Sequence, residues 1–255
     1  MWAPVRLPPM NAELFYGRDL AYVHDQAFGH LARAGGETLL RLLARQGFDA
    51  GLVVELGSGS GITAQLVTES GYDVFGVEVS ADLVELARTR SPEATFLNAS
   101  LLDAELPRCV AVAAIGECFN YAFDDRAGDG ALGVIFQRVF EALEPGGLFV
   151  FDIAEPGRER GGPRRDWSEG PDWTLCLEAS EDHAARTLQR RITVFRQVDG
   201  GFHRSDELHR LRLYEVQDVL KGLEAAGFEA RRLGAYGSAV HFGRGHSGFL
   251  ATRRR

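Results

Sequence analysis

One stretch of the sequence, residues 53–61, decides the fold, and it reads VVELGSGSG. A run of apolar, mostly β-branched residues ends in three glycines at alternate positions, Gly57, Gly59 and Gly61, and a segment of helical period follows directly. Glycine adopts positive φ without strain and leaves room for a ligand to approach the backbone. In an open α/β sheet such a turn lies at the carboxyl end of the first strand, where ligands bind. We therefore expect a ligand crevice above this strand.

Short apolar runs alternate with helical segments over residues 52–153, as they do in a parallel sheet with crossover helices. We expect strands over 52–56, 73–78, 94–97, 110–115 and 148–153. We expect helices over 62–70, 81–90, 132–143 and 216–226, and apolar runs over 228–233 and 248–251 that complete the sheet. The predicted fold class is α/β, a doubly wound, mostly parallel sheet of seven strands.

Two further regions accompany this α/β domain, which we place at residues 48–155 and 215–255. Residues 1–47 form an N-terminal helical cap, since a helical pattern extends over 11–46 and Gly47 ends it. Residues 156–214 form an exposed connection rich in Gly, Pro and Arg, followed by an antiparallel β lobe. Alternation of period two occurs over 173–177, 188–195 and 209–214, with a turn at 199–201. We expect a hairpin or a three-stranded sheet there.

The composition is that of an ordinary globular protein, with 255 residues, 45% hydrophobic and 25% charged, and a net charge of −8. Cys109, Cys118 and Cys176 include no C-x-x-C pair, which argues against a disulfide framework and a zinc site. No apolar run approaches the roughly 20 residues that cross a bilayer, so we expect no membrane partner and a cytoplasmic location. An acidic chain without a basic stripe argues against a nucleic-acid partner. Monomer and homodimer both stay open.

Two acidic residues beside the glycine turn distinguish between possible ligands. A dinucleotide fingerprint, G-x-G-x-x-G/A, places its third small residue where this chain has Ile62, so the third glycine comes one position early. Glu55 would repel a pyrophosphate and attract a cationic amino-acid group. Glu78 ends the second strand, where a carboxylate can accept hydrogen bonds from both hydroxyls of a ribose. Together they favour a nucleoside that bears an amino acid.

Five segments, taken in order, resemble the class I S-adenosylmethionine-dependent methyltransferases: VVELGSGSG (53–61), VFGVEVS (74–80), FLNASLLD (96–103), AAIGECFNY (113–121) and LEPGGLFVFD (143–152). The F-N-Y form of the fourth segment and the antiparallel insertion resemble small-molecule N-methyltransferases, such as the glycine, sarcosine and aminosugar enzymes. This resemblance implies S-adenosylmethionine as the methyl donor and a small-molecule acceptor.

The resemblance also implies roles for residues at the strand ends. Glu55 and the glycine turn would line the methionine end, Glu78 would hold the ribose, and Val79 would lie beside the adenine. The family often has an acid near the adenine amino group, where this chain has Ser100 and Leu101. The residues expected to bind the donor are Tyr16, Arg33, Glu55, Gly57, Ser58, Gly59, Gly61, Glu78, Val79, Ser100, Leu101, Glu117 and Asn120.

Candidate bases for an acceptor that must lose a proton lie in two places. The N-terminal cap combines Tyr16, Tyr22 and His24, and we expect Tyr22 and His24 to contact the acceptor, although ordinary packing of a covering helix is the other interpretation. His241 follows the penultimate apolar run and can face the acceptor. Arg33 can pair with the donor's carboxylate, or lie at the surface.

Three functions remain in view at this point. The first is methyl transfer to a small polar acceptor, with nitrogen favoured over oxygen, by in-line displacement. The second is a nicotinamide-dependent oxidoreductase, which shares the strand, the glycine turn and the acid of the second strand. The third is a non-catalytic nucleoside-binding module. Nothing in the histidine and cysteine spacing predicts a metal site.

Overall fold

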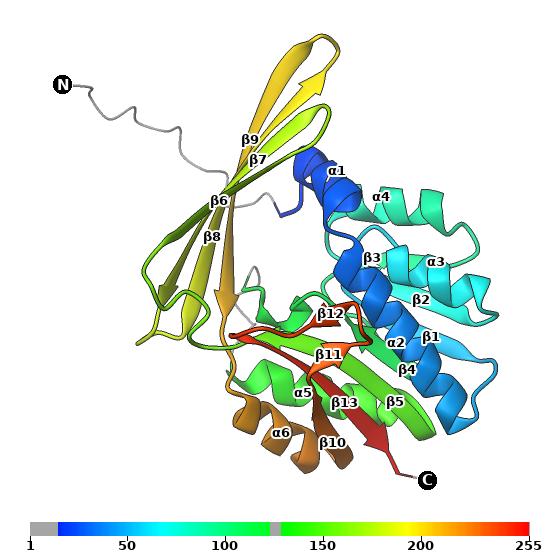
Figure 1. Ribbon diagram of the computed structural model, residues 1–255. Coiled ribbons are helices and arrows are strands. Elements are labelled where there is room, and N and C mark those ends of the chain that lie inside the picture. The colour runs from blue at the N-terminus through cyan, green and yellow to red at the C-terminus, as the bar shows by residue number, and fades with distance from the viewer. Residues whose placement is uncertain (1–14, 123–128, 255) are drawn as a thin grey trace.

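The computed structural model describes residues 15–122 and 129–254, and its largest element is a seven-stranded sheet of order β10-β13-β5-β4-β1-β2-β3 (Figure 1). Its strands are β1 (Leu52–Leu56), β2 (Asp73–Glu78), β3 (Thr95–Asn98), β4 (Cys109–Ala114), β5 (Leu143–Ala154), β10 (Phe228–Leu233) and β13 (His246–Arg253). Strands β1 to β5 pair in parallel, whereas β13 runs antiparallel to β5 and β10. This sheet confirms the predicted α/β class, and β1 and β2 have the predicted bounds.

Helices cover both faces of the sheet. The helices of the α/β part are α2 (His30–Gln46), α3 (Ile62–Glu69), α4 (Ala81–Arg90), α5 (Asp129–Ala142) and α6 (Val216–Ala225). Side chains alternate along each strand, so Val53 packs among residues of α2, α3 and α4, while Val54 packs among residues of α5 and α6. The sheet is therefore doubly wound, as expected.

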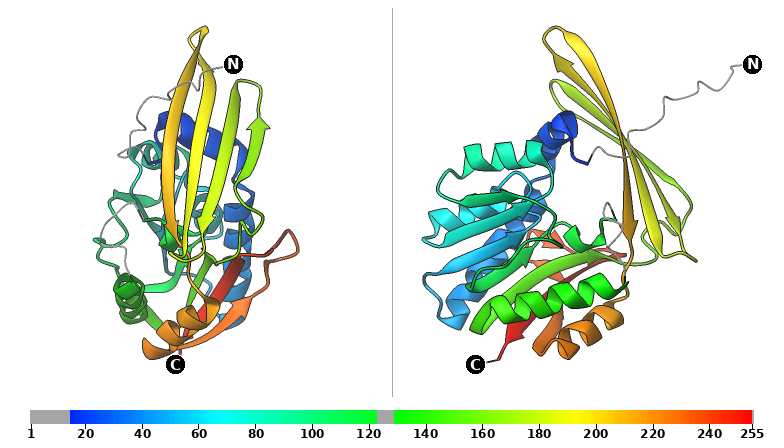
Figure 2. Two further views of the ribbon diagram at one scale, coloured as in Figure 1. Left: turned by 90° about the vertical axis from the view of Figure 1, so that its left-hand side faces the viewer. Right: turned by 180° about the vertical axis from the view of Figure 1, so that it is seen from behind.

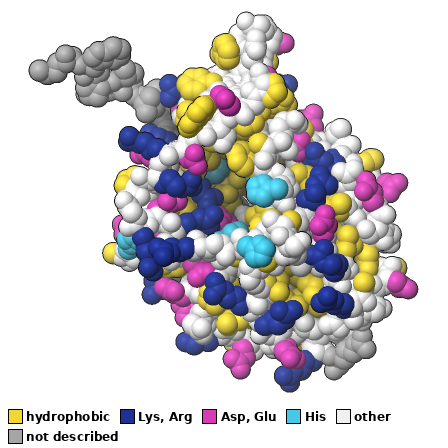
Figure 3. Space-filling model, in the orientation of Figure 1, with side chains coloured by type: hydrophobic (Ala, Val, Ile, Leu, Met, Phe, Trp, Pro, Cys, Tyr) yellow, Lys and Arg dark blue, Asp and Glu magenta, His cyan; other side chains and the backbone are white. Residues whose placement is uncertain are grey.

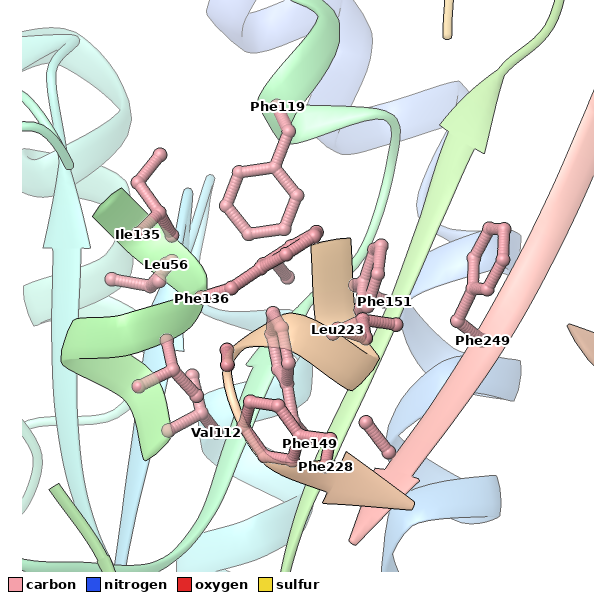
Figure 4. Packing of buried hydrophobic residues seen from close by; sticks show 14 of the residues in the cluster. Leu56, Val112, Phe119, Ile135, Phe136, Phe149, Phe151, Leu223, Phe228 and Phe249 are labelled. Carbon is pink, nitrogen blue, oxygen red and sulfur yellow. The ribbon is translucent and has the colours of Figure 1, made fainter. Parts of the chain in front are cut away.

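Phenylalanine rings fill the face of the sheet under α5 and α6 (Figure 4). The rings of Phe149 and Phe151 stack with centroids 4.5 Å apart, and those of Phe151 and Phe249 with centroids 5.0 Å apart. Phe119, from the short 3-10 helix η1 (Cys118–Asn120), meets Phe136 and Phe151 edge-on. Because close-packed protein interiors are hardly compressible, packing of Phe119 in this core fixes the position of the turn after β4.

The N-terminal cap consists of two helices, α1 (Arg18–Ala27) and α2, where the sequence predicted one helical run; residues 11–14 lie outside the described part of the chain. The break falls at Phe28 and Gly29. A Cβ on Gly29 would lie 2.5 Å from the Cδ1 atom of Ile62, at the start of α3. Close packing against the glycine turn therefore decides where the cap bends. Gly47 ends α2 in a left-handed conformation, as predicted.

A second, antiparallel sheet of order β6-β7-β8-β9 stands beside the first, and we call it the β lobe (Figures 1 and 2). Its strands are β6 (Arg164–Glu169), β7 (Trp173–Asp182), β8 (Thr187–Val198) and β9 (Gly201–Arg212). β6 falls in the stretch predicted to be an exposed connection. It is a largely exposed, polar edge strand that pairs through its backbone with β7, so its side chains carry no period-two signal. The predicted turn at Asp199 and Gly200 joins β8 to β9, with φ of 51° and 80°.

The β lobe packs against α1 through an apolar cluster. Leu20 and Val23 of α1 lie among Trp173, Ile192 and Val194 of the lobe. A short hairpin, β11 (Ala235–Tyr236) and β12 (Val240–His241), connects β10 with β13. Within residues 15–122 and 129–254, no helix has the length and apolar character needed to cross a membrane.

Candidate active site

A cavity opens at the carboxyl ends of β1, β2 and β4, where the strand order reverses between β1 and β4. This is the place at which open α/β sheets bind ligands. It encloses about 800 Å³ of empty space, part of it open to solvent. Its walls come from the glycine turn, the ends of the strands and the N-terminal cap. In the space-filling view, hydrophobic side chains line a hollow between the β lobe and the rest of the molecule, with Lys and Arg side chains beside it (Figure 3).

The glycine turn forms the floor of the cavity. Gly57, Gly59 and Gly61 have φ of 72°, 54° and 77°. The amides of Gly57 and Ser58 both donate to the carbonyl oxygen of Val77, at 2.8 and 3.1 Å. A Cβ on Gly57 would lie 2.6 Å from the Sγ atom of Cys118. Both the backbone angle and the space therefore require glycine at position 57.

Glu78 lies at the end of β2 with 6% of its surface exposed. Its two carboxylate oxygens accept hydrogen bonds from the amides of Gly59 and Ser80, each at 2.9 Å. Burial raises the pKa of Glu78 above its ordinary value, although these two amides act against the rise. Each carboxylate oxygen has a further lone pair, so Glu78 can accept two hydroxyl hydrogen bonds from a ligand.

Glu55 and Ser58 leave polar atoms without partners in the same wall. The Oε2 atom of Glu55 and the Oγ atom of Ser58 are buried and have no hydrogen-bond partner. Burial raises the pKa of Glu55 to about 8, and the nearby Glu78 carboxylate adds to the rise. Buried polar atoms are almost always paired. The unpaired oxygens therefore fit a ligand that carries hydrogen-bond donors and positive charge.

The charge of the described cavity wall decides between the two kinds of nucleoside ligand. It contains two carboxylates, Glu55 and Glu78, and neither lysine nor arginine among its described residues. A pyrophosphate would find no cation in this wall, whereas a sulfonium or an ammonium group would favour the ionised form of both carboxylates and be attracted to them. The described residues contain no group of three His, Cys, Asp or Glu side chains arranged to hold a metal ion.

Aromatic hydroxyls form the edge of the cavity nearest the β lobe. The Oη atoms of Tyr16 and Tyr121 lie 3.0 Å apart, and both residues line the cavity together with Phe15. Burial raises the pKa of Tyr16 and of Tyr121, so both hydroxyls stay protonated near neutral pH. Two neutral hydroxyls bonded to each other keep one free proton and several free lone pairs. They can therefore both accept from and donate to a bound molecule.

Two buried polar residues of the β lobe stand behind this edge, and sequence reasoning missed their part in it. Glu207 accepts hydrogen bonds from the amides of Tyr16 and Gly17, at 2.8 and 2.9 Å. The Nε2 atom of His209 lies 2.7 Å from Glu207, and the His209 ring packs 5.0 Å from that of Tyr16. The available signal was alternation: Glu207, His209 and Leu211 occupy one buried face of β9, where an acid and a histidine are unusual.

Of the predicted bases, the structure brings His24 to the cavity and not the other two. The Nδ1 atom of His24 is buried without a partner, and burial lowers the pKa of His24 to about 4. Tyr22 instead donates its hydroxyl to Asp172 at 3.0 Å and lies under the guanidinium of Arg196, against the β lobe. His241 is exposed on β12 and is not among the described residues of the cavity wall.

Arg33 lies in a separate hollow, whose described lining residues have Gly29 and Ile62 in common with those of the cavity. Its neighbour Ala32 lines the cavity. Successive residues of a helix point about 100° apart, so the position of Ala32 directs Arg33 away. The structure therefore does not bring this predicted cation to the cavity.

Of the residues predicted to contact the adenine of the donor, some line the cavity and one does not. Val79 and Leu101 line the cavity beside Ala99. Ser100 is not among the described lining residues, and its Oγ atom accepts a hydrogen bond from the amide of Leu102 at 3.2 Å. Its hydroxyl therefore stabilises the local turn.

Glu117 and Asn120 connect the sheet with the β lobe and are not among the described residues of the cavity wall. Glu117 forms ion pairs with Arg158 and Arg190. Burial disfavours its charge, but the two arginines prevail and hold the pKa of Glu117 at about 2. Asn120 donates its side-chain amide to the carbonyl oxygens of Ala154 and Arg212, at 2.9 and 2.6 Å. Both side chains therefore fix the position of neighbouring Tyr121.

Known methyltransferases are similar to this chain in sequence. Residues 53–147 match the family model described as a methyltransferase domain. Over 221 residues the chain is 23% identical to the dTDP-3-amino-3,6-dideoxy-alpha-D-glucopyranose N,N-dimethyltransferase of Streptomyces fradiae, which covers 83% of this chain and 84% of that protein.

Solved structures share the fold over nearly the whole chain. An S-adenosylmethionine-dependent methyltransferase from Clostridium acetobutylicum superposes with a TM-score of 0.78 at 14% identity, covering 92% of this chain and 98% of the other. The sugar N-methyltransferase KedS8 from Streptoalloteichus sp. superposes with a TM-score of 0.74 at 20% identity, covering 100% and 99%. Both include the β lobe within the region that superposes, since so little of this chain lies outside it.

Proposed function

Residues 53–147 match a methyltransferase domain, and the fold is that of S-adenosylmethionine-dependent methyltransferases; from this premise we propose that the chain transfers a methyl group from S-adenosylmethionine to an amine nitrogen on a small polar acceptor. The observation that carries the proposal is the position of the Tyr16 and Tyr121 hydroxyls, 3.0 Å apart on the edge of the cavity that holds Glu55 and Glu78. One wall suits a cationic nucleoside, and the other offers neutral hydrogen-bonding groups to an acceptor.

The donor would be held by residues whose unpaired atoms fit it. Glu78 would accept the two ribose hydroxyls, Leu101 and Val79 would cover the base, and Glu55 would face the positively charged amino-acid end. When bound, S-adenosylmethionine supplies a methyl group on a sulfonium, which is already activated for displacement. This chain's residues then have to align the acceptor and exclude water.

An amine suits the acceptor side better than a hydroxyl. A hydroxyl acceptor needs a base, but Tyr16 and Tyr121 have raised pKa values and His24, with a pKa of about 4, is a weak one. A neutral amine attacks through its own lone pair. Tyrosine lone pairs can accept the N–H bonds of that amine and turn its lone pair toward the methyl group. The proton lost after transfer can pass to water.

The relatives support an amine on a sugar or a similarly polar small molecule. The Streptomyces fradiae relative is named for an amino sugar that it dimethylates at nitrogen, and KedS8 is named as a sugar N-methyltransferase. We propose the same class of acceptor here, and a cytoplasmic location for the enzyme.

Two measurements test this function. Calorimetry with S-adenosylhomocysteine should give micromolar binding to the unmodified protein, at least tenfold weaker binding to Glu78→Ala, and no binding of a nicotinamide dinucleotide. A panel of amino sugars, simple amines and matched hydroxy analogues is then assayed for S-adenosylhomocysteine release. Turnover restricted to the amines supports the proposal. Turnover restricted to the hydroxy analogues, or binding without turnover on the whole panel, would overturn it.

A further inference from the structure

A carboxylate of the β lobe, Glu207, is connected with the ribose-side carboxylate Glu78 by a short path of hydrogen bonds. We propose that Glu207 is a positioning residue for methyl transfer, acting through Tyr16 on both the acceptor edge and the donor wall of the cavity. This inference rests on the proposed function for its acceptor side. Its donor side is independent of the identity of the acceptor.

The path runs through the backbone of Tyr16. Glu207 accepts from the Tyr16 amide at 2.8 Å, and the Tyr16 carbonyl oxygen accepts from the Oγ atom of Ser80 at 2.7 Å. The Ser80 amide in turn donates to Glu78 at 2.9 Å. Ser80 also caps α4 by accepting from the amide of Leu83 at 3.1 Å, so its own position is fixed. Tyr16 is therefore held from both sides.

The conformation of Tyr16 explains why such a hold is needed. Its φ is 48°, in the left-handed region that residues with a Cβ rarely adopt. A conformation of this kind persists only where the surrounding structure imposes it. It turns the Tyr16 carbonyl toward Ser80 and leaves the hydroxyl 3.0 Å from that of Tyr121. Among the described residues, the Tyr16 amide finds its acceptor on Glu207 of the β lobe and not within the N-terminal cap.

Glu207 is buried and surrounded by groups that can hydrogen-bond to its carboxylate. It is 1% exposed and receives three contacts, from the amides of Tyr16 and Gly17 and from the ring of His209. The two amides precede and begin α1, where helix N–H groups have no partner within the helix. A carboxylate offers two acceptor oxygens, whereas the amide of glutamine offers one and would place N–H groups against donors. Glu207→Gln therefore disrupts the hydrogen bonds that fix the amides of Tyr16 and Gly17, while the side chain keeps nearly the same size.

The test is a double-mutant cycle between Glu207 and Tyr16. Tyr16→Phe keeps the backbone path and removes only the hydroxyl. If Glu207 acts on the acceptor edge by placing that hydroxyl, Glu207→Gln lowers kcat about 10- to 100-fold in the unmodified protein. In the Tyr16→Phe background it lowers kcat less than about twofold, because there is no hydroxyl left to place.

The donor side has its own measurement. Because the backbone path is present in both backgrounds, Glu207→Gln should weaken S-adenosylhomocysteine binding by about three- to tenfold in each, as measured by calorimetry. Asp206→Asn is the matched control: the neighbouring acid lies on the opposite face of β9, paired with Arg204 and Thr193, and its removal should change neither quantity.

The results separate this inference from the proposed function. Equal losses of kcat in both backgrounds, or a lower melting temperature with unchanged kcat and unchanged binding, would overturn the positioning role. If the unmodified protein turns over no amine, the proposed function fails, and the binding measurement alone then decides whether Glu207 supports the donor wall. Unchanged binding in that case would overturn the donor side as well.

Discussion

The Nη2 atom of Arg190, on strand β8 of the β lobe, donates to the Oε2 atom of Glu117, in the turn between β4 and η1, over 2.7 Å. Arg158 holds the other carboxylate oxygen. The contact with Arg190 ties the β lobe to the turn after β4, next to the cavity, and both contacts require the negative charge of Glu117.

Acid should weaken the ion pairs of Glu117 with Arg158 and Arg190. Burial opposes ionisation of Glu117, but the two arginines hold its pKa at about 2, below the 4.5 of an unperturbed glutamate. A lowered folded-state pKa stabilises the protein above pH 4.5, and this contribution is lost as pH falls from about 4.5 to about 2. The full shift corresponds to about 3 kcal/mol of unfolding free energy, of which we expect about 2 kcal/mol to be lost between pH 6 and pH 3. Urea unfolding at pH 6 and pH 3 measures it, and Glu117→Gln should lose less over that interval. An equal loss in both proteins would contradict this account.

Glycine at position 57 should be essential for donor binding. Alanine there would combine φ of 72° with a Cβ 2.6 Å from the Sγ atom of Cys118. Gly71→Ala is a matched control, since Gly71 has φ of 91° but open space around its Cβ position. Both variants should lose about 1 kcal/mol of stability through the backbone conformation. Only Gly57→Ala should also lose at least tenfold in S-adenosylhomocysteine affinity by calorimetry, and retained affinity would show that the turn can adjust.

Donor affinity should rise with pH. Burial raises the pKa of Glu55 to about 8, so this group is mostly neutral at pH 7 in the free protein. A cationic ligand favours the ionised form, so binding releases close to one proton, and affinity increases from pH 6 to about pH 8. The same raised pKa means that Glu55 stabilises the free fold at low pH and that this contribution is lost between about pH 4.5 and 8. Calorimetry in buffers of different ionisation enthalpy counts the released protons. Glu55→Gln should release none, and an unmodified protein that released none would refute the assignment.

The tyrosine pair should affect turnover more than donor binding. Tyr121→Phe removes one hydroxyl of the pair that lies over the cavity edge. We expect kcat to fall about tenfold, the value of one hydrogen bond to the reacting amine, with S-adenosylhomocysteine affinity changed less than about twofold. Tyr72→Phe is the control, because the Tyr72 hydroxyl donates to the Phe48 carbonyl oxygen, away from the cavity. A fall in affinity that matched the fall in kcat would indicate that Tyr121 contacts the donor.

The parts of the fold that the sequence predicts well are those decided by local pattern. β1 and β2 are short apolar runs, the first followed by a glycine and the second ending in an acid, so their bounds, the glycine turn and the positions of Glu55 and Glu78 follow from the residues alone. β6 does not, because a polar edge strand is specified by its partner and not by its own side chains. The predicted contact between Arg33 and the donor could not be judged from the sequence for a similar reason. Only the packing of α2 decides which of two adjacent residues, Ala32 or Arg33, faces the cavity.

The acceptor edge depends on contacts between distant segments. Glu207 and Tyr16 are 191 residues apart in the chain, and no local pattern links them. The alternation in β9 places Glu207 and His209 on a buried face, but only the fold shows that this face meets the start of α1. The function of a strand residue of the β lobe therefore became visible only with the tertiary structure.

The two hydroxyls at the acceptor edge are anchored to different parts of the fold. Tyr121 follows Phe119, whose ring is wedged into the phenylalanine core under α5, so one side of the opening inherits the rigidity of the sheet. Tyr16 is held between Ser80, at the start of α4, and Glu207 of the β lobe. The position of its hydroxyl therefore depends on β9, the strand that carries Glu207, and directed changes of acceptor specificity should begin there.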